Sequence, residues 1–394
     1  MKTAYLGKIQ LSDVDLSYLR EAQRLSDVTY ILEITPRFSR GPAFCLPRVA
    51  PRTGIFKATE LYPEFQRYAS CIDLDRFYVA NTSGSFWQLK AFWTNFLLLL
   101  FLLRGGFNVI HVTWPPNIYE FVLYFLRRRM LLTVHDPFPH TGLDTFIVRL
   151  RRKFAFKFIR KFILLNRAQK QDFCSFYHIV PQRVTVSALS CYDYLQSVPT
   201  SASAESSPYV LSFGKISPYK GIDYLLPAMV EAHKRLPGLK LIVAGSGKYP
   251  FETSPYKEVP YIELRNRFIP DEELVSLIRG AAFVVCPYTD ATQSGVIMSA
   301  FAFNKPVLAT NVGGLPEMVE NGRFGRIIPE KNAEALAEAI VEMGSDAEAL
   351  RTYSENIAAA YQRGGEKSWQ AIAEKLLQEY SQCANVQMCE CAKA

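Results

Sequence analysis

The stretch FVVCPYTDATQSGVIMSAFAFNKPVLATNVGGLPE, residues 283–317, decides the fold of this chain. It begins with an apolar, β-branched run that ends at Pro287, passes through a polar segment, and takes on a helical pattern from Gly295 to about Phe303. A second apolar run at 306–310 follows at once. Strand, loop, helix and strand in this order predict a βαβ unit and therefore a parallel sheet.

The polar segment of this unit lies where parallel sheets bind ligands, at the carboxyl ends of the strands. A helix that begins there presents free N–H groups and the positive end of its dipole, which suits a phosphate or a diphosphate. An ordinary crossover without a ligand has the same pattern, so this stretch alone leaves both interpretations open.

Length and charge set the broad class of the protein. A chain of 394 residues, 49% hydrophobic, can bury a large core and is expected to form two domains. Residues 1–200 carry 26 Lys and Arg against 14 Asp and Glu, whereas residues 201–394 carry 19 against 23. The first half is thus +12 and the second −4, which indicates a surface in the first half that meets a membrane, a nucleic acid or an acidic ligand.

The cysteines and apolar segments point to a cytoplasmic protein. Several of the eight cysteines lie in apolar runs, where reduced buried thiols are usual, so a reducing compartment is expected. Cys389 and Cys391 have no partner His or CxxC nearby, which favours a frayed tail over a metal site. The longest charge-free apolar segment, 91–103, is shorter than the ~20 residues of a membrane span, and no signal peptide precedes it.

The first half alternates strands and helices, which predicts an open parallel sheet with polar residues at its carboxyl edge. Strands are expected at 3–9, 28–34, 108–113 and 130–134, and helices at 16–25, 86–103 and 117–128. The strand at 130–134 delivers His135 and Asp136 to this edge.

A basic segment follows, because residues 149–170 contain nine Lys and Arg and no acid, with apolar residues three or four apart. This pattern predicts an amphipathic helix and then a strand near 162–165. Its basic side chains either lie on anionic lipid or form the solvated face of a core helix. No nucleic-acid-binding motif is present. The residues expected on the acceptor or membrane side are Arg127, Arg128, Arg129, Arg151, Arg152, Lys153 and Lys157.

Four sequence blocks in the second half resemble one family. They are GKISPYKG at 214–221, LIVAGSG at 241–247, FIPDEEL at 268–274, and KPVLAT at 305–310 with Gly313, Gly314 and Glu317 after it. Together they resemble the C-terminal domain of glycosyltransferase family 4. The segment TVHD at 133–136 looks like the strand of that family that ends in a cleft histidine, and residues 368–380 look like its C-terminal helix.

The resemblance implies a GT-B fold, an α/β architecture of two Rossmann-like domains facing across a cleft, with the last helix crossing back to the first domain. The expected parts are an N-terminal domain at 1–195, a linker at 196–207, a C-terminal domain at 208–365, and the crossing helix and tail at 366–394. The linker fits its Ser-, Ala- and Pro-rich composition.

The family transfers a sugar from a nucleotide diphosphate with retention of configuration, generally without a metal. Other groups must then neutralise the diphosphate. Lys215 and Lys220 match the family's cationic pair, although the first is more often Arg there. The residues that the resemblance places at the donor are Gly7, Gln293, Ser294, Gly295, Val296 and Arg267.

The sequence departs from the family at its acidic pair. Asp290 is the nearest match to the first glutamate, and the second falls at Met298 or Ser299, which carry no carboxylate. His135 is expected near the donor sugar as a hydrogen-bonding or electrostatic group. His140 is expected to face the acceptor.

These features predict a retaining glycosyltransferase, peripheral on the inner face of the cell membrane, that uses a UDP- or GDP-sugar and a lipid-linked or polysaccharide acceptor. No cofactor, metal or nucleic acid is expected. Two alternatives stay open: a GT-B protein that binds a nucleotide sugar or glycan without transfer, and a soluble synthase of small glycosides.

Overall fold

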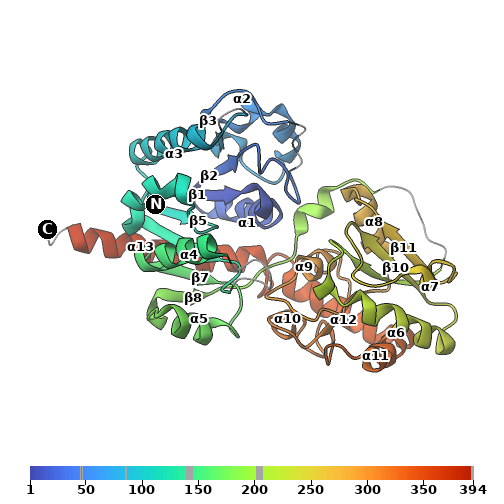
Figure 1. The fold of residues 1–394 in the computed structure, drawn as a ribbon. Helices are drawn as coiled ribbons and strands as arrows, with labels where there is room; N and C mark the ends of the chain where they lie inside the picture. The colour runs from blue at the N-terminus through green and yellow to red at the C-terminus, as the bar shows by residue number, and fades with distance from the viewer. Residues whose placement is uncertain (45, 47, 85–86, 139–144, 201–206, 392–394) are drawn as a thin grey trace. The chain divides into compact units, whose positions relative to one another are not determined.

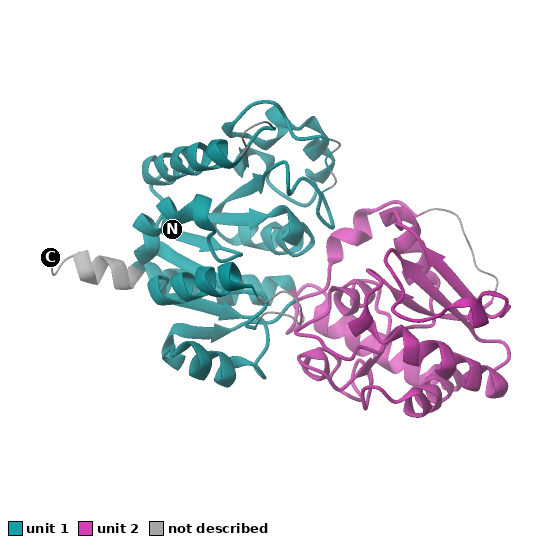
Figure 2. Cartoon of the chain, viewed as in Figure 1, with its two compact units in different colours: residues 1–189, 369–394 teal, residues 190–368 magenta. Residues whose placement is uncertain are grey.

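The computed structural model describes residues 1–391 apart from 45, 47, 85–86, 139–144 and 201–206 (Figure 1). The chain forms two compact units, residues 1–189 with 369–394 and residues 190–368 (Figure 2). The boundary between the two units at residues 189 and 190 therefore lies before the segment 196–207, which the composition predicts to be a linker. A reason is visible at Tyr192, whose N–H donates to the carbonyl of Met298 at 3.1 Å and ties this segment to the second unit.

The described part of unit 1 contains an eight-stranded sheet in the order β3-β4-β2-β1-β5-β6-β7-β8. The central strands are buried and read as nearly continuous apolar runs, as parallel strands covered on both faces do. Only β3 is antiparallel to its neighbour among these strands, so the expected parallel sheet has one antiparallel edge. The strands are β1 (Lys2–Lys8), β2 (Asp27–Ile34), β3 (Gly54–Lys57), β4 (Phe77–Asn81), β5 (Val109–Val112), β6 (Met130–Val134), β7 (Lys161–Leu164) and β8 (Val184–Val186).

Helices cover this sheet, and those at Ser12–Leu25, Trp87–Arg104 and Phe146–Phe158 lie where the sequence predicts helices. The helix expected at 117–128 is instead the 3-10 helix η4, which begins after a capping box formed by Asn117 and Glu120. Among the helices that the structure describes, none is both long and apolar enough to cross a bilayer. The helices of unit 1 are η1 (Ile9–Leu11), α1 (Ser12–Leu25), α2 (Ala58–Leu61), η2 (Pro63–Tyr68), η3 (Leu74–Arg76), α3 (Trp87–Arg104), η4 (Ile118–Arg129), α4 (Phe146–Phe158), α5 (Lys170–Tyr177), η5 (Pro181–Arg183) and α13 (Trp369–Cys391).

The C-terminal helix α13 returns to unit 1, as predicted, and packs on α1. Trp369 lies edge-on to Tyr18, with ring centroids 6.3 Å apart. Farther along α13, Glu379 forms an ion pair with Lys161 of β7 at 3.0 Å. The last helix of the chain is therefore part of the core of the first unit.

The described part of unit 2 contains a six-stranded, fully parallel sheet in the order β11-β10-β9-β12-β13-β14. Its strands are β9 (Tyr209–Phe213), β10 (Lys240–Gly245), β11 (Ile262–Asn266), β12 (Phe283–Cys286), β13 (Val307–Thr310) and β14 (Gly325–Ile328). Its helices are η6 (Asp193–Ser197), η7 (Pro218–Lys220), α6 (Ile222–Arg235), α7 (Ser254–Lys257), α8 (Asp271–Gly280), α9 (Gly295–Phe301), α10 (Leu315–Val319), α11 (Ala333–Ser345) and α12 (Ala347–Tyr361). The βαβ unit predicted from residues 283–310 is confirmed as β12, α9 and β13.

Candidate functional site

Three loops of unit 2 meet at the carboxyl ends of the adjacent strands β9, β12 and β13. The backbone N–H of Thr289, after β12, donates to the carbonyl of Tyr219, after β9, at 2.8 Å. A Cβ built on Gly214 would lie 3.3 Å from Cγ2 of Val296 on α9. The loops at 214–221 and 287–294 and the first turn of α9 therefore form one surface.

Two glycines permit the close approach of these loops. Gly221 has φ +65°, and a Cβ there would lie 1.8 Å from the carbonyl oxygen of Pro287. Gly313, after β13, has φ +50°, and its Cβ would lie 1.5 Å from the carbonyl oxygen of Ala291. At both positions the backbone is left-handed, and the nearest atom to an added Cβ belongs to the backbone. A backbone atom cannot move aside as the end of a flexible side chain can, so both positions favour glycine.

Lys220 is the cation held inside this surface. Its Nζ donates to the hydroxyl of Tyr288 at 2.6 Å and lies 4.0 Å from the centroid of that ring. Burial lowers the pKa of Lys220 to about 8, because desolvation disfavours the ammonium form. The chain thus keeps a desolvated cation where a helix begins.

The polar segment after β12 leads into α9. Ser294 caps this helix, and its Oγ accepts from the N–H of Ile297 at 3.4 Å. Gly295 and Val296 are half-buried in the first turn. The side-chain oxygen of Gln293 is buried and accepts no hydrogen bond from the described residues.

The remaining charged candidates of this surface are exposed. Lys215 follows β9 and has no ion-pair partner in the part of the chain that the structure describes. Asp290 is exposed on the loop after β12. Met298 and Ser299 are buried instead, and the Ser299 hydroxyl donates to the carbonyl of Gly295 at 2.9 Å.

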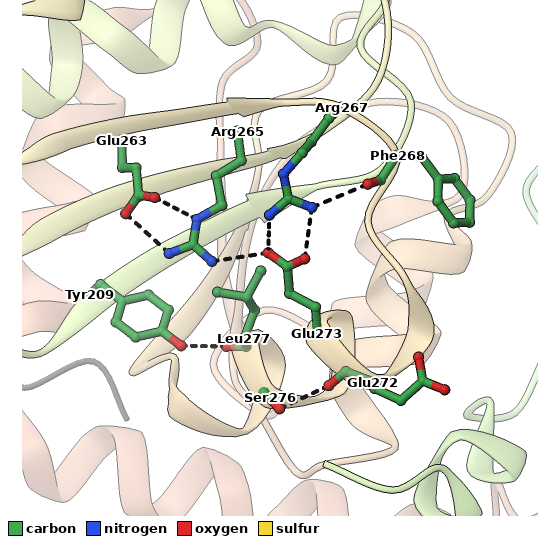
Figure 3. Close-up of polar contacts among 9 residues, drawn as sticks. All are labelled: Tyr209, Glu263, Arg265, Arg267, Phe268, Glu272, Glu273, Ser276 and Leu277. Carbon is green, nitrogen blue, oxygen red and sulfur yellow. Dashed lines mark hydrogen bonds and ion pairs between the residues drawn. The ribbon is translucent and has the colours of Figure 1, made fainter. Parts of the chain in front are cut away.

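Arg267 belongs to a charged cluster after β11. Its guanidinium makes two bonds to the carboxylate of Glu273, at 2.6 and 2.7 Å, and Arg265 donates to the same carboxylate at 3.2 Å (Figure 3). Hydrogen bonds from Arg267 lower the pKa of Glu273. The side chain of Phe268, drawn beside this cluster, is 73% exposed. The structure thus places a guanidinium held by two hydrogen bonds beside an exposed aromatic ring.

The sequence model of the family "Glycosyl transferases group 1" matches residues 207–346, which include all of these loops. Residues 207–346 are therefore similar to the group 1 glycosyl transferases. The resemblance predicted from the four sequence blocks is confirmed over it.

Relatives and solved structures agree with this assignment. A D-inositol 3-phosphate glycosyltransferase of Corynebacterium glutamicum is 28% identical over 55% of this chain and 56% of its own. The chain spans about half the length of the curated relatives that it matches. A sucrose-phosphate synthase of Thermosynechococcus elongatus covers 97% of this chain and 98% of its own with TM-score 0.67 and 17% identity. The Anabaena protein Alr3699/HepE, solved with UDP and glucose, covers 97% and 100% with TM-score 0.66 and 17% identity. These likenesses confirm the predicted GT-B fold.

In the first unit, Gly7 lies near the end of the first strand, and its place at the donor stays a prediction. Gly7 lies inside β1, paired with Leu32, and not on a loop. A Cβ there would lie 2.2 Å from the Asp15 carboxylate and 2.6 Å from the ring of Tyr30. Gly7 is therefore required for packing behind the strand.

Lys8, the last residue of β1, forms ion pairs with two residues of unit 1. Its ammonium donates to the carboxylates of Glu33 and Glu120. These carboxylates neutralise the Lys8 ammonium, and the Arg151 guanidinium also interacts with Glu120. An anion would not be attracted there by Lys8.

His135 follows β6, as predicted, and is buried. Its ring lies near that of Trp114, with centroids 6.5 Å apart, and burial lowers its pKa to about 4. The imidazole is therefore neutral at pH 7 and can act as a hydrogen-bonding group but not as a cation. His140 lies outside the described residues.

The predicted basic face divides into two groups. Arg127, Arg128, Lys153 and Lys157 are exposed, and Arg129 is half-buried. Arg152 is wrongly placed in that prediction: it is buried and donates to the carbonyls of Asp136 and Pro137 at 2.6 and 2.8 Å.

Arg151 is half-buried as well, and its guanidinium lies 5.8 Å from the ring of Trp114. Arg151 is adjacent to Arg152 on α4. Both side chains are at least half-buried, whereas those of Lys153 and Lys157 are exposed. One helix thus carries both structural and exposed cations.

Large apolar side chains are exposed beside the exposed cations. They include Phe121 and Phe125 on η4, and Phe146, Ile147, Leu150 and Phe154 on α4. The two helices are neighbours, since the rings of Tyr124 and Phe158 lie 6.0 Å apart. We call these six apolar residues, with Arg127, Arg128, Lys153 and Lys157, the basic aromatic face.

Sequence reasoning missed two groups of polar residues. One is Tyr288, which holds Lys220. The other is His111 on β5, whose Nδ1 lies 2.5 Å from the hydroxyl of Tyr380 and whose Nε2 lies 2.7 Å from that of Thr133. A histidine within an apolar strand is a signal for such a buried network, but its partner 269 residues away is not readable from the local sequence.

Proposed function

We propose that this chain transfers a sugar from a UDP- or GDP-sugar to a lipid-linked or polysaccharide acceptor at the inner face of the cell membrane, with retention of configuration. The observation that supports it best is Lys220, a desolvated cation beside the start of α9 within the range that is similar to the group 1 glycosyl transferases.

The donor diphosphate is proposed to bind at the surface formed by the loops after β9 and β12. Lys220 and Lys215 would neutralise its charge, and N–H groups at Gly295 and Val296 would donate to phosphate oxygens. The Anabaena structure with UDP and glucose supports a uridine nucleotide as the first donor to test. Gln293 has a buried oxygen free to accept from the ligand.

The reaction would break the bond between the anomeric carbon and the β-phosphate oxygen. Negative charge develops on that oxygen, and the two lysines would stabilise it where it forms. The acceptor hydroxyl would attack from the same face, and its proton would pass to the departing phosphate. Such front-face transfer needs no carboxylate nucleophile.

The acceptor is proposed to lie in a membrane, because the basic aromatic face combines two features of lipid-binding surfaces. Its cations would attract anionic head groups, and its exposed aromatic rings would enter the interface. A soluble protein has little reason to expose six large apolar side chains on two neighbouring helices.

The test is a binding titration of UDP, GDP and ADP by calorimetry, followed by a transfer assay with the sugar conjugate of the nucleotide that binds. Lys220→Ala and Lys215→Ala are each expected to weaken binding by about tenfold or more, because each removes a charged contact. Lys234→Ala is the control, since Lys234 is exposed on α6 and paired with Glu231. Equal binding by all three variants, or none by the wild type, would contradict the proposal.

A further inference from the structure

Tyr288 has a fixed position beneath Lys220. It is 2% exposed, and its carbonyl accepts from the Thr310 hydroxyl of β13 at 2.5 Å. The next residue, Thr289, is bonded to Tyr219 through its backbone. Both sides of the loop therefore fix the direction in which the tyrosine side chain leaves the backbone.

The hydrogen bonds of the Tyr288 hydroxyl have a defined direction. An ammonium group only donates, so the Tyr288 oxygen accepts from Lys220 at 2.6 Å. Its own hydrogen is then available to the Cys286 sulfur or to Ser294, whose Oγ lies 3.1 Å away and already accepts from Ile297. A chain of bonds thus runs from Lys220 through Tyr288 to the capping residue of α9.

We propose that Tyr288 is a positioning residue that holds the Lys220 ammonium at the donor diphosphate through its hydroxyl group. This inference rests on the proposed function of the site. A lysine side chain has four rotatable bonds and therefore many rotamers. Without a fixed hydrogen-bond acceptor, its ammonium group would be distributed over many positions. The ring of a tyrosine attracts the ammonium group through its electron-rich face, and the hydroxyl oxygen accepts one directed hydrogen bond from it.

The other groups that face Lys220 do not supply such an acceptor. Tyr219 of η7 presents its ring, with Nζ 5.4 Å from the centroid. Cys286 of β12 is a buried thiol whose own pKa burial raises to about 11, so it is uncharged at neutral pH. No carboxylate forms an ion pair with Lys220 among the described residues. Removal of the Tyr288 hydroxyl is therefore expected to change the pKa of Lys220.

The test compares Tyr288→Phe with Tyr219→Phe, because each removes one hydroxyl group from a ring beside the same lysine. The Lys220 amine is titrated by NMR in the free protein, and UDP affinity is measured from pH 7 to 10. In Tyr288→Phe the Lys220 pKa is expected to fall further, and UDP to bind about tenfold more weakly at pH 9 and above for each unit of that fall. Tyr219→Phe is expected to leave the Lys220 titration as in the wild type, because Lys220 lies against the Tyr219 ring, which the variant keeps.

Thermal melting of each variant shows whether it is folded. An unchanged Lys220 titration in Tyr288→Phe, with UDP binding intact, would overturn the positioning role alone. Failure of the wild type to bind UDP, GDP or ADP would instead overturn the proposed function, while the NMR titration still reports the contact between Tyr288 and Lys220.

Discussion

The hydroxyl of Tyr380 on α13 lies 2.8 Å from the hydroxyl of Tyr18 on α1, although 362 residues separate them. The same Tyr380 hydroxyl lies 2.5 Å from Nδ1 of His111 on β5. All three side chains are buried. The last helix is thus bound to the first unit by a polar network inside an apolar core.

Removing this hydroxyl should destabilise the fold. Tyr380→Phe leaves the His111 nitrogen and the Tyr18 hydroxyl without their partner, which is expected to cost about 1–3 kcal/mol of unfolding free energy. Denaturant unfolding measures it. Tyr78→Phe in the same unit is the control, because Tyr78 is only partly buried and its hydroxyl forms no hydrogen bond with the described residues. Equal stability of the two variants would contradict this role.

The loop contact at Gly221 should be equally sensitive. Gly221→Ala places a Cβ 1.8 Å from the Pro287 carbonyl in a left-handed backbone, so the two loops must separate. We expect a loss of stability of roughly 1–3 kcal/mol, together with a loss of nucleotide binding. Gly238→Ala, where nothing lies within 4 Å of the new Cβ, should change neither. Thermal melting with and without UDP separates the two effects.

The Lys220 ammonium should lower the unfolding free energy at neutral pH, although it contributes to nucleotide binding. Its pKa is about 8 in the folded protein and about 10.5 in the unfolded chain, so the folded state binds fewer protons between these values. Unfolding free energy therefore rises with pH through this window and is lowest, for this group, below pH 8.

Lys220→Met is accordingly expected to raise the unfolding free energy at pH 7 by about 1–3 kcal/mol and to abolish nucleotide binding. Lys234→Met, at an exposed ion pair, should stay within about 0.5 kcal/mol of the wild type. Chemical unfolding at pH 7 and pH 10 checks the sign, since the advantage of Lys220→Met should shrink at the higher pH. A loss of stability in Lys220→Met at pH 7 would show that the ammonium is a structural group.

A transferase that neutralises its diphosphate with lysines should not need a divalent metal. We expect transfer activity to change less than twofold after dialysis against EDTA, whereas Lys220→Ala loses it. A loss of activity that added Mg²⁺ or Mn²⁺ restores would contradict the proposed roles of Lys215 and Lys220.

The βαβ unit at 283–310 was predictable because three of its features are local: apolar runs, a capping serine and loop glycines. Arg152 was not, because a helical pattern of basic residues does not say which of two neighbouring cations turns toward the carbonyls of Asp136 and Pro137. Tyr288 was missed for a related reason, since its partner Lys220 is 68 residues away and only the parallel sheet brings them together. β4, at Phe77–Asn81, was also missed.

The basic aromatic face gives the last prediction. Wild-type protein should float with vesicles that contain anionic lipid at low salt and be released as salt screens the cations. Lys153→Glu with Lys157→Glu should weaken partition by about tenfold or more, because each basic residue near such a surface contributes about 1 kcal/mol. Lys234→Glu with Lys257→Glu makes the same charge change at exposed positions of unit 2 and should still float. If both double variants float equally, or the wild type floats at no salt concentration, the face does not bind lipid and the acceptor must be sought in solution.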